Sequence, residues 1–198
     1  FRNGWSWLSN AKLNWDVLLE KDLKNLVVLP ESPRVVMSIA ERMRDSDALL
    51  KLRSQAIAID DRHVLNWMSQ GEARVALIPL QRCLSLLRLD PRMSIALPES
   101  GAPLNWTVLV RPFSSKEPLP ESWIKDAWSS PLMFHLLASG WIPPVPRSEL
   151  LELWDQIPKS YQSLVIPPDD VWSSCWSLPT LNLAQKTTLI ERWHDSTP

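Results

Sequence analysis

The chain contains few glycines, histidines and cysteines, and these scarcities exclude several kinds of site. Only four of its 198 residues are glycine, and neither G-x-G-x-x-G nor G-x-x-x-x-G-K-[ST] occurs, so no phosphate-binding loop is predicted. The three histidines have no H-x-x-x-H or H-E-x-x-H spacing, and Cys83 and Cys175 form no C-x-x-C pair. G-x-S-x-G is also absent. We therefore expect no catalytic residue, no metal site, no cofactor and no enzymatic role.

The chain also lacks an excess of basic charge and a long apolar run. Its net charge is −1 and its isoelectric point is about 6.4, so it has no basic field that would bind a nucleic-acid backbone. The longest apolar stretches are far too short to span a bilayer. No signal segment follows Phe1 and Arg2, and we expect the chain to be processed or a fragment of a longer protein.

Proline and tryptophan, in contrast, are abundant. The 18 prolines alternate with leucine and aromatic residues, which indicates ordered loops and not one disordered tract. Of the 12 tryptophans, Trp123 and Trp128 have the spacing of core anchors on a helix. Trp106 differs, because it lies between a turn and an apolar run, where an indole can face a cleft. It is a candidate ligand contact.

The first part of the chain alternates between strand and helix patterns. Residues 26–30 form a β-branched run of the kind found in buried strands, and Ser32 is placed to cap a helix that begins at Pro33. Further strands are predicted at residues 71–80, 93–101 and 106–112, and helices at 33–43, 47–59, 63–70 and 81–89. This order predicts an α/β fold with parallel strands and crossover helices.

The pattern becomes helical beyond Pro112. Residues 120–140 have a helical composition, and Ser148 is placed to cap another short helix. Residues 181–195 form a last amphipathic helical pattern. We therefore expect strands alternating with helices in the first part of the chain and helices in the second.

The order of several motifs resembles that of the spermidine/putrescine-binding proteins of ABC transporters. The stretches that carry the resemblance are WDVLLEKDLKNLVVLPESPRVV at residues 15–36, GEARVALIPL at 71–80, LPESGAPLNWTVLVRP at 97–112, ESWIKDAWSSPLMFHLLASGWIPPVPRSELLEL at 121–153 and IPPDDVWSSCW at 166–176. Each motif is weak alone, but the ordered set covers nearly the whole chain.

The resemblance implies a type 2 periplasmic-binding-protein fold, in which two α/β lobes joined by crossing strands hold a ligand between them. Residues 1–108 would form the second lobe, residues 109–145 would return to the first lobe, and residues 146–198 would brace both. The N-terminal half of the first lobe, with a signal or lipoprotein segment, would precede Phe1. The implied role is the capture of a small solute in the periplasm, or outside the cell on a lipid anchor, for an ABC permease of a bacterial membrane.

The resemblance also indicates where the ligand would bind. The family has an acidic residue where this chain has Val35, an aromatic residue where it has Pro79, and a Trp-Trp-Asp type of sequence at Asn105, Trp106 and Thr107. An ammonium group that loses water without gaining a carboxylate costs several kcal/mol, whereas an indole face returns about 0.5–2 kcal/mol. We therefore expect a solute less cationic than spermidine.

Neutral hydrogen-bonding side chains and one indole remain as candidates for the cleft. The predicted ligand-binding residues are Ser32, Gln81, Asn105, Trp106 and Thr107. The free N–H groups at the helix start after Ser32, together with Arg34, would also favour an anionic group.

Two other classes of function remain open. The chain could be a protein-interaction module whose ligand cleft has decayed and whose tryptophan-rich surfaces dock a partner. An enzyme on the same two-lobed fold, as in some tetrapyrrole-forming deaminases, would need a reactive cysteine or acid in the cleft. Neither Cys83 nor Cys175 lies at a predicted cleft position.

Overall fold

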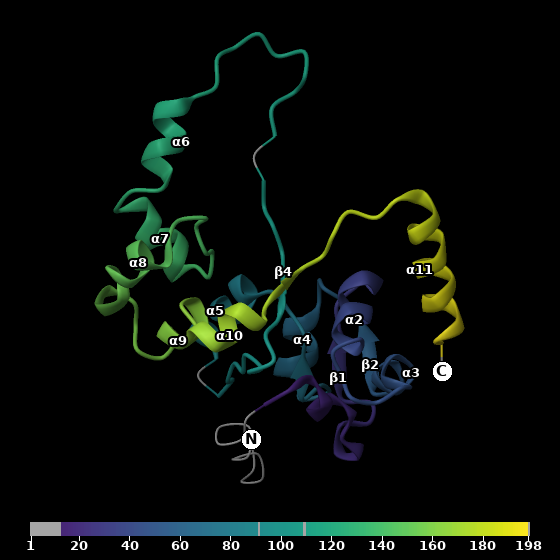
Figure 1. Ribbon diagram of the computed structural model, residues 1–198. Coiled ribbons are helices and arrows are strands. Elements are labelled where there is room, and N and C mark those ends of the chain that lie inside the picture. The colour runs from purple at the N-terminus through teal and green to yellow at the C-terminus, as the bar shows by residue number, and fades with distance from the viewer. Residues whose placement is uncertain (1–12, 91, 109, 198) are drawn as a thin grey trace.

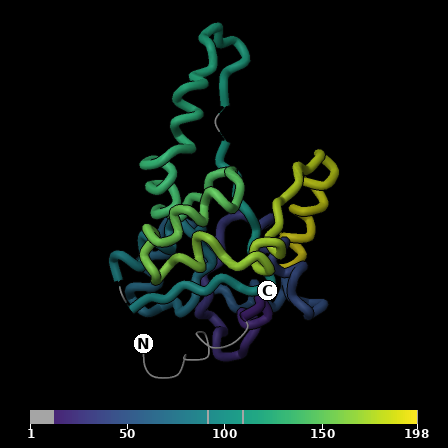
Figure 2. Tube along the Cα trace, turned by 60° about the vertical axis from the view of Figure 1, so that its left-hand side comes forward, coloured from purple at the N-terminus to yellow at the C-terminus, as the bar shows by residue number. Residues whose placement is uncertain are grey.

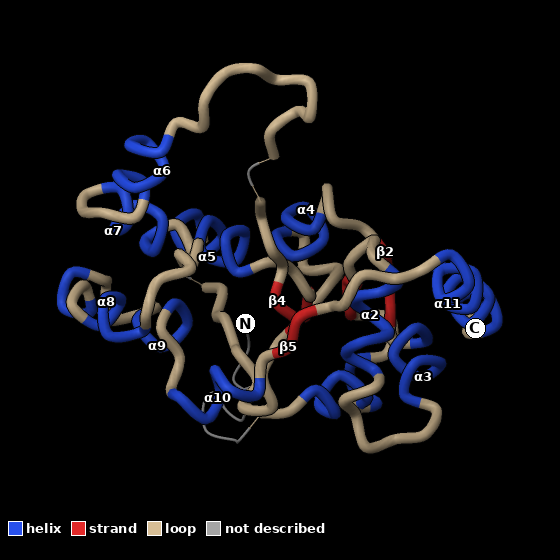
Figure 3. The backbone as a smooth tube through the Cα atoms, turned by 45° about the horizontal axis from the view of Figure 1, so that its top comes forward, coloured by secondary structure: helices blue, strands red, loops and turns tan. Residues whose placement is uncertain are grey.

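The computed structural model describes residues 13–90, 92–108 and 110–197 and has the predicted α/β character (Figure 1). The strands lie near the centre with helices on either side (Figure 3). The strands are β1 (Val27–Leu29), β2 (Ala56–Ile59), β3 (Val75–Ala76), β4 (Pro103–Leu104) and β5 (Trp176–Ser177). The helices are α2 (Pro33–Ala40), α3 (Ala48–Ser54), α4 (Val64–Ser69), α5 (Leu80–Leu89), α6 (Glu121–Ala127), α7 (Leu132–Ala138), α8 (Arg147–Leu151), α9 (Gln162–Val165), α10 (Asp169–Ser174) and α11 (Leu183–Asp195), with 3-10 helices η1 (Trp15–Leu19), η2 (Lys21–Leu23) and η3 (Trp154–Gln156).

The larger sheet has three parallel strands in the order β2-β1-β3. Strands are confirmed within the predicted ranges 26–30 and 71–80, although β3 is only two residues long. The helix predicted over residues 47–59 is wrong in its second half, because α3 ends at Ser54 and residues 56–59 pair with β1. A short run of alanine and isoleucine fits helix and strand equally well by its pattern, so pairing with a buried strand decides between them.

The central strand β1 is buried on both faces. Val27 and Leu29 belong to a first core between the sheet, α2 and α3, whereas Val28 belongs to a cluster on the other face with Val64 of α4. The alternation follows from the two-residue period of a strand. The first core consists of Leu18, Leu23, Val27, Leu29, Val36, Ile39, Ala40, Met43, Ala48, Leu52 and Leu77.

Helix α2 begins as the sequence predicts. Ser32 is its N-cap, and the Ser32 Oγ accepts a hydrogen bond of 3.4 Å from the backbone N–H of Val35. Pro33 occupies the first helical position, where its missing N–H costs nothing. The buried face of the helix, which includes Val36 and Ile39, then packs on the sheet.

The chain after Met93 differs from the prediction. The strands predicted at residues 93–101 and 106–112 are wrong, because the described residues in these ranges lie outside strands. The strand in this region is β4, and its Pro103 and Leu104 pair in parallel with β5. Leu109, where the return to a first lobe is predicted to begin, lies outside the described residues.

After β4 the chain extends away from the sheet and comes back at α6 (Figures 1 and 2). We call residues 105–108 and 110–119 the exposed segment. Its large apolar side chains are 52% to 108% exposed, and they are Trp106, Val108, Val110, Phe113 and Leu119. Side chains of this kind are normally buried in a folded protein, so five of them exposed along one segment form an unusual surface.

Helices α5, α7, α8 and α9 enclose a core of their own. Leu84, Leu137, Leu150 and Val165, one from each helix, are buried in it. The helical character predicted for residues 120–140 is confirmed by α6 and α7. The cap predicted at Ser148 is wrong, because α8 begins at Arg147 with Pro146 as its N-cap, and the restricted φ of proline fits this position.

The amphipathic helix predicted at residues 181–195 is confirmed as α11. Asn182 and Gln185 form a capping box at its start. The helix packs on α2, and the Arg53 guanidinium lies 4.0 Å from the centre of the Trp193 ring. No helix among the described residues combines the length and the apolar character needed to cross a membrane.

Candidate functional site

The carboxyl edge of the larger sheet is the first candidate site. In the order β2-β1-β3 the chain leaves β1 toward β2 on one side and reaches β3 on the other side. Open parallel sheets bind ligands beyond the carboxyl ends of their strands, at the point where the strand order reverses. That point lies here between β1 and β3, so the residues that follow these two strands are the candidates.

Two predicted ligand-binding residues lie at this edge. Ser32 follows β1 and caps α2, and Gln81 is the second residue of α5, the helix that follows β3. Both residues are half-buried. A side chain added at Gly140 would come within 3.1 Å of the Gln81 backbone, so the turn after α7 packs closely on the start of α5. The structure therefore brings Ser32 and Gln81 to neighbouring strand ends.

The other three predicted residues follow β4. Asn105, Trp106 and Thr107 are exposed at the start of the exposed segment, and β4 packs against α2. The Trp106 Nε1 donates a hydrogen bond of 2.9 Å to the Ser177 Oγ, while 67% of the residue remains exposed. Trp106 is thus tied to β5 by its nitrogen and leaves its ring accessible. No hydrogen bond between described residues joins these three residues to Ser32 or Gln81.

The carboxyl edge also carries acids that sequence reasoning did not assign to the site. Asp60 follows β2, and its backbone N–H donates to the Leu29 carbonyl beside it. Its Oδ1 accepts hydrogen bonds from the backbone N–H groups of His63 (2.9 Å) and Arg62 (2.7 Å), and its Oδ2 lies 3.0 Å from His63 Nδ1 and 3.3 Å from Trp67 Nε1. These donors, the His63 N–H first, hold the pKa of the Asp60 carboxyl far below its usual range. No sequence signal decides this placement, because the pattern of residues 56–59 fits helix and strand equally well.

Glu31 and Asp61 complete the acidic groups of this edge. Glu31 follows β1 and is exposed, and no ion pair is formed by its carboxylate with a described residue. The carbonyl oxygen of Asp61 accepts a hydrogen bond from the Arg82 guanidinium, which ties α5 to the loop after β2. The Asp61 carboxylate, like that of Glu31, forms no ion pair with a described residue, so the edge offers two carboxylates beside hydroxyl and amide groups.

Cys83 lies in α5, two residues after Gln81. Burial raises the pKa of the Cys83 thiol to about 11, so it stays protonated and is a poor nucleophile at neutral pH. Among the described residues, no group of three or more His, Cys, Asp or Glu side chains could hold a metal ion.

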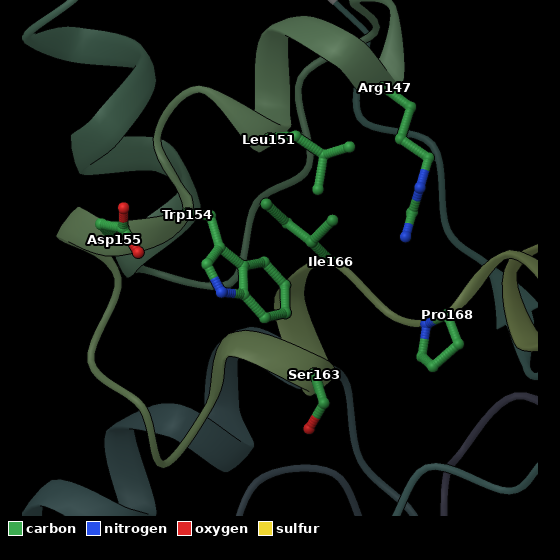
Figure 4. Close-up of a pocket in the computed structure, with 7 residues that line it drawn as sticks. All are labelled: Arg147, Leu151, Trp154, Asp155, Ser163, Ile166 and Pro168. Atoms are coloured by element: carbon green, nitrogen blue, oxygen red, sulfur yellow. The ribbon is translucent and has the colours of Figure 1, made fainter.

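A second candidate site is a groove in the helical part of the chain (Figure 4). It has a volume of about 400 Å³ and is lined by Arg147, Leu151, Trp154, Asp155, Ser163, Ile166 and Pro168. The Trp154 ring and the side chains of Leu151 and Ile166 face one another across it (Figure 4). The groove shares no residue with the carboxyl edge, and no sequence motif marks it.

Comparisons of the chain with protein-family models, with curated proteins and with solved structures find no match.

Proposed function

We propose that the chain is the solute-binding component of an ABC importer of the polyamine-binding type. The observation that carries the proposal is the parallel β2-β1-β3 sheet with Ser32 and Gln81 at its carboxyl edge. The family resemblance of the motifs predicts ligand-binding residues at this edge. The general rule that open parallel sheets bind ligands beyond the carboxyl ends of their strands independently predicts the same location. In this proposal the protein acts in the periplasm or on a lipid anchor outside the cell and delivers its solute to a membrane permease.

The side chains of the edge favour a small solute with one or two positive groups. Glu31 and Asp61 have the carboxylates that would pair with them, and Ser32 and Gln81 would supply neutral hydrogen bonds. A polyamine with three or four ammonium groups would leave charges without partners here, at several kcal/mol for each desolvated charge. Putrescine and smaller amines therefore fit better than spermidine.

The exposed segment supports the two-lobed form of the proposal. It continues from β4, next to α2, and carries apolar side chains that contact no core. In the proposal these residues, from Trp106 to Leu119, cross to the other α/β lobe and are buried there. Closure of two lobes around the solute would then be the binding mechanism, with the crossing strands absorbing the change in φ and ψ.

The test is calorimetric titration of the intact protein with putrescine, spermidine, glycine and acetate. We expect putrescine to bind and Glu31→Gln to weaken its binding about tenfold, the loss of one charge-assisted contact. Glu191→Gln, which removes an exposed carboxylate of α11, is the matched control and should leave binding unchanged. Absence of binding by every solute would overturn the proposal.

A protein-interaction module is the second candidate, favoured by the same exposed segment. Trp106, Val110 and Phe113 would then be covered by a separate partner protein. Replacement of all three by serine would abolish capture of that partner, and neither the wild type nor this variant would bind a solute. Under the first proposal, the same replacement would destabilise the intact two-lobed protein and impair solute binding.

A further inference from the structure

The groove between α8, η3 and α9 has the features of a docking site. Leu151 is 47% exposed, and Trp154 beside it is half-buried, whereas Ile166 at the base is 1% exposed. Apolar surface thus lines a hollow of about 400 Å³ that opens to solvent. A hollow of this size accommodates one or two apolar side chains of a partner.

Its two ends differ in charge. At one end the Arg147 guanidinium already has partners within the protein. Its Nε lies 2.6 Å from the Asp169 carboxylate, and its Nη2 donates a hydrogen bond of 2.5 Å to the Pro167 carbonyl. At the other end Asp155 is exposed, and no ion pair joins it to a described residue. The groove therefore presents one free charge to a partner, and that charge is negative.

The surroundings of the groove are acidic as well. Residues 147–170 contain five acidic and two basic side chains, and all five acids are exposed. Such a surface attracts a cationic partner and repels an anionic membrane or a nucleic acid. It complements an amphipathic segment that combines leucine-like anchors with lysine or arginine.

We propose that this groove binds a basic amphipathic segment of a partner protein. An apolar side chain of the segment inserts between Leu151 and Trp154, and a neighbouring lysine or arginine pairs with Asp155. The inference rests on the groove alone and holds whether or not the carboxyl edge binds a solute.

The experiment measures fluorescence anisotropy of a labelled amphipathic 14-residue Leu/Lys peptide with the intact protein, beside a Leu/Glu peptide of the same pattern. We expect the Leu/Lys peptide to bind and the Leu/Glu peptide not to bind. Asp155→Lys and Leu151→Ser should each weaken binding about fivefold or more, as expected for one charge contact or one apolar anchor. Both side chains are exposed, and circular dichroism will verify that the variants fold.

Matched control variants lie on α11, where Glu191 and Leu183 are likewise exposed. Glu191→Lys and Leu183→Ser should leave peptide binding within about twofold. Equal binding of both peptides, equal losses in the α11 variants, or no loss in the groove variants would each overturn the inference. So would binding to vesicles of phosphatidylcholine and phosphatidylserine that Leu151→Ser abolishes and Asp155→Lys strengthens, because this would assign the groove to a membrane.

Discussion

Two stretches with similar β-branched composition differ in secondary structure and in burial. Residues 27–29 form a strand whose side chains are fully buried, whereas residues 106–112 carry a similar pattern and form no strand among their described members. The difference is the presence of neighbours. β1 has a parallel strand on each side and a core on each face, whereas the exposed segment has neither. A sequence pattern typical of strands thus shows that a segment can pair in a sheet. Whether it does so depends on the presence of a neighbouring strand.

The largest expected difference between the two stretches concerns stability. Leu29→Ala removes a fully buried side chain from the first core and should lower the free energy of unfolding by about 2–5 kcal/mol. Leu119→Ala makes the same change in the exposed segment, where 52% of the residue is exposed, and in the 198-residue chain alone it should stay within about 0.5 kcal/mol. Urea denaturation of both variants measures the difference. A comparable loss in Leu119→Ala would mean that the segment is packed in solution, and the comparison would fail.

A smaller effect is expected at the glycines. Gly101 precedes β4 and has a φ of +80°, and a Cβ there would overlap the backbone of Ser174 next to β5. Gly71 has a similar φ of +76° but open space around it. Gly71→Ala should therefore cost about 1–2 kcal/mol for the backbone conformation alone. Gly101→Ala should cost about 1 kcal/mol or more beyond that, because the contact between β4 and β5 must open.

Thermal unfolding of the two glycine variants is the measurement. Equal losses of stability in Gly71→Ala and Gly101→Ala would show that the β4–β5 pair contributes little to the stability of the fold. The exposed segment would then begin before β4. A larger loss in Gly101→Ala would place the boundary between the packed and the exposed stretch at Leu104, as the structure has it.

The parts of the fold that the sequence predicted are those governed by local chemistry. Ser32 and Pro33 specify the start of α2, and Asn182 specifies the start of α11, because capping depends on side chains a few residues apart. The pairing of residues 56–59 with β1 and the absence of pairing at 106–112 depend on distant neighbours, so pattern alone could not decide them.

The same distinction between local and distant contacts explains which residues of the candidate site could be predicted. Ser32 and Gln81 each follow a strand that the sequence pattern predicts, and the strand order brings these two predicted residues to one edge. Asp60 could not be assigned to this edge, because the helix predicted over residues 47–59 includes the residues of β2. The groove at Trp154 could not be predicted, since it is formed by the packing of three short helical turns and has no sequence motif.

The smallest expected effect concerns Asp60 and appears only in acid. Its lowered pKa means that the native state favours the carboxylate, so Asp60 stabilises the fold above the pKa of the unfolded chain, about 3.9. This stabilisation is lost as the pH falls from about 4 toward the lower native pKa. Asp60→Asn cannot titrate, so the stability difference between wild type and variant should shrink below pH 4.

Urea midpoints measured between pH 7 and pH 2.5 test this expectation. His63→Ala separates the two kinds of donor, because it removes the imidazole and keeps both backbone N–H groups that bind the Asp60 Oδ1. If the backbone donors dominate, His63→Ala retains most of the acid dependence, and the loop after β2 is held by its own turn. If the acid dependence of stability disappears when the imidazole is removed, the His63 ring orders this loop. Side-chain contacts would then determine the conformation of the carboxyl edge.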